Sequence, residues 1–314
     1  MSGPIDESSR KSTNLGMTVI EVREGRATNI GELGIVRVLP TKNRRTIGPW
    51  CFVDLMQSDD VDRPPQLEIG PHPHIGLATV TWLFAGSALH SDSLGTEQLI
   101  RPGQLNLMTA GHGIAHAEEG VDTDASWSAS GTMGVQMWLA QPEATRHGGS
   151  GFQHLAELPE TNLGPSRAGV LIGSLGDATS PAQFAHPTIG LDLTLRGPTT
   201  IPIEPTFEHG VVPIDKPIRV EEDIVEPGSL AIVPPGREHL TIDARSHPTR
   251  LMLLGGAPLG DEVKMWWNFV ARTTDELTEA WHDWQGGNED RFGPVPSGLA
   301  RMEAPTPPWI RQDV

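Results

Sequence analysis

Residues 70–120 read GPHPHIGLATVTWLFAGSALHSDSLGTEQLIRPGQLNLMTAGHGIAHAEEG, and this stretch decides the fold. It holds two pairs of potential metal ligands, His72 with His74 and His116 with Glu118, each at a spacing of two. Residues two apart in a strand point to the same face of the sheet. Between the pairs, alternating runs such as TVTWLF are separated by Gly-Ser and Pro-Gly, which predicts consecutive antiparallel strands. If these strands curl into a small barrel, three imidazoles and one carboxylate converge inside it as a mononuclear metal site.

The rest of the chain shows the same strand-like pattern. Glycine (35) and proline (28) are spread between short alternating runs of the 314 residues, which favours an all-β protein rich in turns. The length suits two domains. We predict five segments: a mobile tail (residues 1–16), a metal-binding barrel (17–150), a connector with a short helix over FQHLAEL (151–168), a second barrel without metal ligands (169–292) and an irregular tail (293–314).

A weak internal repeat supports two related barrels. Aligning Arg101–Glu118 with Glu226–Asp243 keeps the pattern P-G-x-L and a later glycine in register, which indicates a duplicated unit. The alignment places Thr241 where the first copy has His116, and the neighbourhood of residues 197–200 where it has the first histidine pair. The repeat therefore keeps the turns and loses the ligands, and we expect one metal site, in the first half.

One helix is predicted near the C-terminus, over residues 274–285. Thr273 and Glu276 have the spacing of a capping box, and Gly286-Gly287 can end the helix. Its apolar stripe is expected to pack on a sheet rather than to bind a ligand.

Composition excludes several classes of protein. The net charge of −17 opposes direct nucleic-acid binding, which depends on lysine and arginine neutralising phosphates. There is no leading apolar segment and no apolar run of about 18 residues, so a cytoplasmic protein without a membrane span is expected. The single cysteine, Cys51, lies in the apolar run WCFVDLM, which indicates an inert core thiol.

Taken together, PHPHIGLATVTWLFAGS, MTAGHGIAHAEEG, RRTIGPWCFVDLM, PLGDEV and WNFVARTTDELTEA resemble the pirin family over residues 17–292. The resemblance implies a bicupin, two tandem antiparallel β-barrels with a short C-terminal helix, whose first barrel holds one metal, usually iron. The family's four ligands fall on His72, His74, His116 and Glu118. Three other positions depart from the common pattern and are expected at the pocket rim: Ile75, Ala78 and His112.

Three imidazoles and one carboxylate leave two positions open on a six-coordinate metal, close to the arrangement of iron(II) oxygenases. Fe(II) is the expected ion; zinc, copper, nickel, manganese and cobalt remain alternatives. A simpler alternative is that the histidines only satisfy loop backbone groups.

The resemblance implies a quercetin 2,3-dioxygenase type of reaction, with a flavonol or related enolisable phenol and dioxygen as substrates. Glu118 would then serve as both ligand and general base. The second hypothesis is a redox-responsive regulator that binds a transcription factor or metabolic enzyme.

Overall fold

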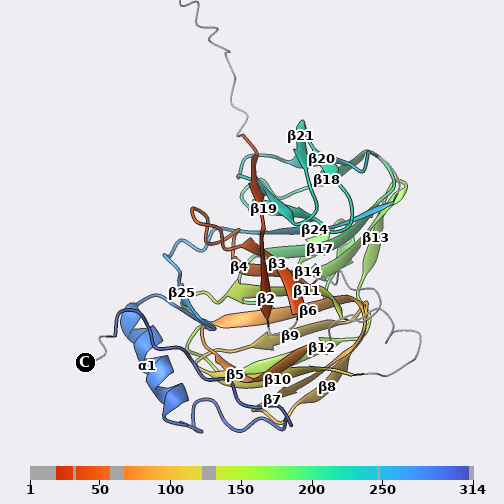
Figure 1. The fold of residues 1–314 in the computed structure, drawn as a ribbon. Helices are drawn as coiled ribbons and strands as arrows, with labels where there is room; N and C mark the ends of the chain where they lie inside the picture. The colour runs from red at the N-terminus through yellow and green to blue at the C-terminus, as the bar shows by residue number, and fades with distance from the viewer. Residues whose placement is uncertain (1–18, 31–32, 57–66, 122–131, 246–247, 311–314) are drawn as a thin grey trace, which may run out of the picture.

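The computed structural model describes residues 19–30, 33–56, 67–121, 132–245 and 248–310. The mobile tail predicted for residues 1–16 lies outside the described residues. Within the described ranges the chain forms strands and one helix, which confirms the all-β prediction. Two halves, each made of a seven-stranded and a four-stranded sheet, lie one above the other in Figure 1.

The first half occupies the lower part of Figure 1. Its seven-stranded sheet has the order β12 (Gly151–Leu155), β9 (Leu105–Thr109), β6 (Leu77–Ala85), β11 (Met133–Ala140), β4 (Trp50–Met56), β3 (Leu33–Leu39), β2 (Arg26–Ile30). Its four-stranded sheet has the order β5 (Glu68–His74), β10 (Ile114–Gly120), β7 (Ala88–Asp92), β8 (Glu97–Ile100).

The second half repeats this plan. Its larger sheet has the order β1 (Glu21–Glu24), β22 (Ser229–Val233), β19 (Glu208–Pro213), β24 (Thr249–Gly256), β17 (Thr188–Leu195), β14 (Ser166–Ile172), β13 (Glu160–Leu163). Its smaller sheet has the order β18 (Thr199–Pro202), β23 (His239–Asp243), β20 (Ile218–Val220), β21 (Asp223–Val225). Two further hairpins are β15 (Ser174–Leu175) with β16 (Ala178–Thr179), and β25 (Lys264–Trp266) with β26 (Phe269–Ala271).

The N-terminal strand β1 crosses to the second half at one sheet edge. β1 pairs with β22 of the second half, whereas β12 takes the equivalent place beside β9 in the first half. The prediction of a short helix over FQHLAEL was wrong, because β12 occupies the first four residues of this segment. A helix this short is marginal alone, whereas pairing with β9 satisfies backbone groups at an otherwise open sheet edge. The division of the chain into domains stays a prediction.

The larger sheets of the two halves pack against each other through a shared apolar core. Trp50 on β4 lies in this core with no exposed surface. Its indole Nε1 donates to the carbonyl oxygens of Ile189 and Gly255, 3.1 Å away in each case, and both acceptors belong to the second half. The indole therefore ties the halves together by packing and by hydrogen bonding.

The interior of the second barrel is filled with aliphatic side chains. The repeat is confirmed at the level of strands, since β9 and β10 correspond to β22 and β23 in sheet order. Thr241, however, is exposed, and its neighbours Leu240 and Ile242 fill the interior. Potential metal-binding groups of three or more histidine, cysteine or acidic residues occur, in the described part of the chain, only in the first half.

Helix α1 (Thr274–Gln285) has the predicted bounds and the predicted capping box between Thr273 and Glu276. Its buried residues Leu277, Ala280 and Trp284 pack with Phe269 of β26 and with Ile75, which follows β5. The helix thus covers the outside of the first half, at the left of Figure 1. No helix in the described ranges is long and apolar enough to cross a lipid bilayer.

Candidate metal centre

Strand β10 lies between β5 and β7 and carries two of the predicted ligands. In the antiparallel pairing, His116 lies opposite His72 of β5, and Glu118 lies opposite His90 of β7. A register shift between His116 and Glu118 bends this ladder. The four predicted ligands, His74 among them, are all buried. The spacing of two therefore places side chains from two distant segments inside one barrel.

The ring nitrogens of His72, His74 and His116 lie within 4.8 Å of one another. The carboxylate of Glu118 forms a second such group with His116 and His90. His116 is common to both groups, so the structure brings three predicted ligands into one cluster and joins the fourth to them through His116. Their role as metal ligands stays a prediction.

Hydrogen bonds decide which ring nitrogen of His72 and of His74 carries the proton. Nδ1 of His72 lies 2.9 Å from the carbonyl oxygen of Gly70, and Nδ1 of His74 lies 2.9 Å from that of Asn268. Because a carbonyl only accepts, both Nδ1 atoms must donate, and each Nε2 keeps its lone pair. The Nε2 atoms of His74 and His116 are 3.0 Å apart.

His90 was missed in the sequence analysis. Its Nε2 lies 3.1 Å from Oδ2 of Asp92, and its Nδ1 lies 3.4 Å from Nδ1 of His116. The available signal was the motif H-x-D at residues 90–92, a third pair at a spacing of two within the same stretch. The sequence pattern alone does not show that β7 pairs with β10, and this pairing is what brings His90 to His116.

Burial controls the protonation of the cluster. It lowers the pKa of His72 to about 4, and lowers the pKa of His74 and His116 well below the usual value, because a buried imidazolium loses its hydration. Burial raises the pKa of Glu118 for the same reason. The three imidazoles are therefore neutral near pH 7, which is the form that binds metals.

Glu118 has few hydrogen-bond partners in this interior. The hydroxyl of Thr81 lies 3.2 Å from Oε1 of Glu118 and 2.9 Å from Oε1 of Gln136. A hydroxyl has one hydrogen and can donate to only one of these oxygens at a time. The carboxylate thus has free lone pairs for a cation or for a proton.

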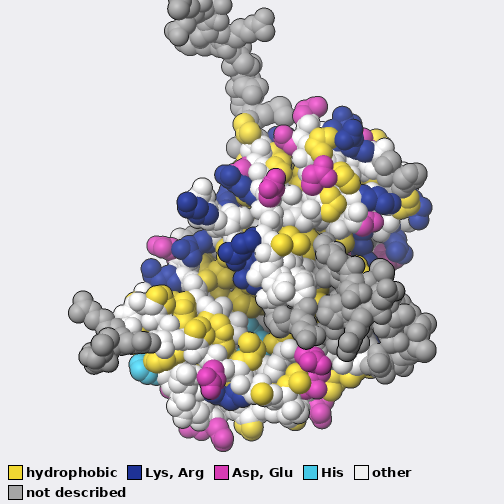
Figure 2. Space-filling model, viewed as in Figure 1, with side chains coloured by type: hydrophobic (Ala, Val, Ile, Leu, Met, Phe, Trp, Pro, Cys, Tyr) yellow, Lys and Arg dark blue, Asp and Glu magenta, His cyan; other side chains and the backbone are white. Residues whose placement is uncertain are grey.

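Aromatic side chains border the cluster. Phe52 and Trp138 are stacked with centroids 4.0 Å apart, and Trp138 lies edge-on to His74 at 5.2 Å. Phe152 of β12 stacks on His90 at 4.6 Å. Figure 2 shows a recessed, largely hydrophobic area in the lower half of the molecule.

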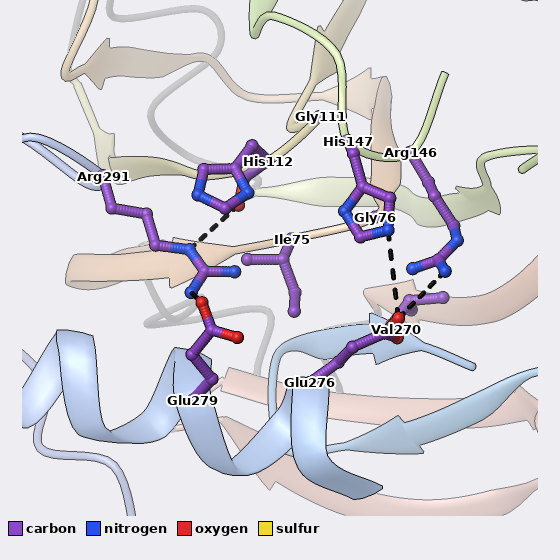
Figure 3. Close-up of a pocket in the computed structure, with 10 residues that line it drawn as sticks. All are labelled: Ile75, Gly76, Gly111, His112, Arg146, His147, Val270, Glu276, Glu279 and Arg291. Carbon is purple, nitrogen blue, oxygen red and sulfur yellow. Dashed lines mark hydrogen bonds and ion pairs between the residues drawn. The ribbon is translucent and has the colours of Figure 1, made fainter. Parts of the chain in front are cut away.

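The prediction that Ile75, Ala78 and His112 lie at the rim of the metal pocket was wrong. Ala78 faces the core between the two halves. Ile75 and His112 line a different pocket, outside the barrel against α1 (Figure 3). There the backbone oxygen of His112 accepts a 3.1 Å bond from Arg291, and burial, followed by the charge of Arg291, lowers the pKa of the His112 imidazole. Strand alternation explains the error for Ile75, because it follows the inward-facing His74.

The Pirin family matches residues 32–139, and the Pirin C-terminal cupin domain matches residues 190–293. A Pseudomonas aeruginosa protein named "putative quercetin 2,3-dioxygenase" is 38% identical over 288 residues, 90% of this chain and 89% of its own length. A pirin-like protein of Caulobacter vibrioides is 34% identical, covering 85% and 93% of the two chains. The crystal structure of a quercetin 2,3-dioxygenase from Acinetobacter baumannii has a TM-score of 0.86 and 37% identity, covering 93% of this chain and 97% of that one.

Proposed function

The chain belongs to the pirin family and has its bicupin fold, and on that premise we propose that it is a metal-dependent dioxygenase. The proposed ligands are His72, His74, His116 and Glu118, and the proposed ion is Fe(II). The proposed substrates are dioxygen and a flavonol or related enolisable phenol. The names carried by the Pseudomonas and Acinetobacter relatives support this reaction class.

A single observation carries the metal proposal. The Nε2 atoms of His74 and His116 are 3.0 Å apart, and His74 carries its proton on Nδ1, so its Nε2 presents a lone pair. This distance is close to the separation of two nitrogens that bind one ion at a right angle, each about 2.1 Å from it. Burial lowers the pKa of both imidazoles well below the usual value, so both are neutral, which is the form that binds a metal. A metal ion satisfies both nitrogens.

The donor set also fits an ion that retains reactive positions. Three imidazole nitrogens and one carboxylate oxygen leave two positions of an octahedral ion open, as in the related non-haem iron sites. When bound, such an ion would act as a Lewis acid toward the substrate hydroxyl and would supply the redox chemistry that dioxygen requires. Zinc, copper, nickel, manganese and cobalt accept the same donors, so the metal that is loaded into the protein decides which ion occupies the site.

The protein's own side chains would then prepare the substrate. Glu118 can accept the proton of the phenolic hydroxyl on a carboxylate oxygen. The stacked Phe52 and Trp138 offer an aromatic wall near His74 that can orient a planar ring. The buried position of these side chains would limit the access of water to the reacting atoms.

The test is aerobic incubation of the iron-loaded protein with quercetin, following both the visible absorbance of the flavonol and the uptake of dioxygen. We expect turnover in the wild type and loss of both metal and turnover in His116→Ala. His209→Leu, which removes a buried histidine of the second barrel, is the matched control and should keep both.

Two results would contradict the proposal. One is a wild-type protein that retains no transition metal after loading, and the other is a metal-loaded protein that leaves quercetin and other catechols unchanged. In the second case, capture of a protein partner in only one oxidation state would support the regulatory hypothesis instead. Figure 2 shows basic and acidic side chains interspersed on one face, so the net charge of −17 does not make that face uniformly acidic.

A further inference from the structure

This inference rests on the proposed metal site and adds two residues to it. We propose that Asp92 and His90 form an outer pair that holds His116 with its Nε2 directed at the ion. Both are positioning residues, because they act on the ion only through His116. The three side chains lie on adjacent strands, β7 and β10, and all are buried.

The pair is anchored at its far end. Oδ1 of Asp92 accepts the backbone N–H groups of Leu94 at 2.9 Å and Thr96 at 3.0 Å. Oδ2 is left for Nε2 of His90, at 3.1 Å. Burial alone would raise the pKa of Asp92, but the hydrogen bonds from His90 and Thr96 outweigh it and lower this pKa. Asp92 is therefore an ionised acceptor.

The proton positions follow from Asp92 outward. Since a carboxylate only accepts, Nε2 of His90 must donate, and Nδ1 of His90 keeps its lone pair. Nδ1 of His116, 3.4 Å away, can then donate a hydrogen to that lone pair. Nε2 of His116 is left as an acceptor, facing Nε2 of His74 at 3.0 Å. One carboxylate thereby sets the tautomers of two imidazoles.

His116 differs in this respect from the other two histidines. His72 and His74 are held by backbone carbonyl oxygens, which no side-chain substitution removes. The acceptor for His116 is a side chain and can be removed without deleting a ligand. Partners of this kind typically contribute about 10- to 100-fold to metal affinity.

Asp92→Asn gives the sharpest test. The two backbone N–H donors hold the side-chain oxygen of the introduced asparagine in the Oδ1 position, so its NH₂ group must face His90. That NH₂ would force His90 to carry its proton on Nδ1, opposite the N–H of His116. His116 must then move its proton to Nε2 or turn away, and either change removes the donated lone pair. An asparagine in place of a triad aspartate acts through the same kind of tautomer reversal.

The measurements are Co(II) affinity by competition with a chelator and the visible spectrum of the Co(II) protein, neither of which depends on turnover. We expect Asp92→Asn to weaken Co(II) binding about 10- to 100-fold and to change the spectrum. Asp192→Asn is the matched control. It removes a largely buried carboxylate that binds Arg250 and Trp82 rather than a histidine, and should leave both readouts unchanged.

A second pair of variants keeps the test decisive if Asp92→Asn does not fold. His90→Gln retains a side-chain oxygen that can accept from Nδ1 of His116, whereas His90→Leu does not. We expect the glutamine variant to bind Co(II) more tightly than the leucine variant. Equal affinity in both variants and the wild type would overturn the proposal.

The outer-pair proposal would also be overturned if the wild type bound two Co(II) ions and both His90 variants bound one. His90 would then be a direct ligand of a second ion, together with His116 and Glu118. Failure of the proposed function has a different signature, since a wild type that binds no metal at all, or binds it without flavonol turnover, refutes the dioxygenase. A wild type that binds Co(II) while every Asp92 and His90 variant binds it equally well refutes only the outer pair.

Discussion

A histidine in the second barrel allows burial to be tested by a pH-dependent measurement away from the candidate metal centre. His209 on β19 is almost fully buried, and its Nδ1 has no hydrogen-bond partner in the described part of the chain. Gly255 makes room for the ring, since a Cβ there would lie 2.6 Å from Cδ2 of His209. Burial lowers the pKa of His209 to about 4, although Glu204 acts in the opposite direction. The folded protein therefore keeps this imidazole neutral.

The magnitude follows from proton linkage. The pKa is lower in the folded state than the ordinary value of 6.5, so between these two values the unfolded chain binds more protons at this site. Stability contributed by the neutral form is thus present above pH 6.5 and is lost as the pH falls toward 4. One pKa unit corresponds to about 1.4 kcal/mol, so at pH 5, about 1.5 units below the unfolded value, the loss is about 2 kcal/mol.

The experiment compares wild type with His209→Leu by urea unfolding at pH 7 and pH 5, in the presence of a chelator so that metal binding does not contribute. The fall in unfolding free energy between the two pH values should be smaller in the variant by about 2 kcal/mol. The buried histidines of the first barrel contribute equally to both proteins and cancel in this difference. If the two proteins lose the same free energy, His209 is solvated or protonated in the native state and the reasoning is refuted.

Two further predictions concern the core. Trp50→Phe removes the donor shared by the carbonyl oxygens of Ile189 and Gly255, so we expect the free energy of unfolding in urea to fall by about 1–3 kcal/mol, with an unchanged Co(II) spectrum. An unchanged unfolding midpoint would show that the indole N–H does not stabilise the contact between the halves. Burial raises the pKa of Cys51 to about 12, with Arg272 acting in the opposite direction. A thiol reagent at pH 8 should therefore modify one thiol in denatured protein and leave native protein unmodified. Equal modification rates in the two states would contradict this prediction.

The part of the site that could be predicted is the part encoded by strand periodicity. A spacing of two places His72 and His74, and likewise His116 and Glu118, on single faces, and the pairing of β5 with β10 brings these faces together. His90 and Asp92 have the same spacing, but their role depends on β7 pairing with the other side of β10, which local pattern does not specify.

The remaining errors have the same physical origin. The segment at residues 152–158 has a helical pattern but is too short to form a stable helix alone, and the open edge of β9 decides that β12 forms over residues 151–155. In the repeat, the turns align but the interior positions fall on Leu240 and Ile242 rather than on Thr241. A shift of one residue reverses which side chains face inward, so turn motifs alone do not identify interior positions.

The carbonyl oxygen that orients His74 belongs to Asn268, which lies 194 positions later in the chain. The segment beyond it runs past β5 as well, where Met302 donates its N–H to Pro71, and Gly70 leaves space for the carbonyl oxygen of Ala300. During synthesis the first barrel emerges from the ribosome long before these residues exist. The nascent barrel would therefore present His74 unoriented until the last residues of the chain arrive.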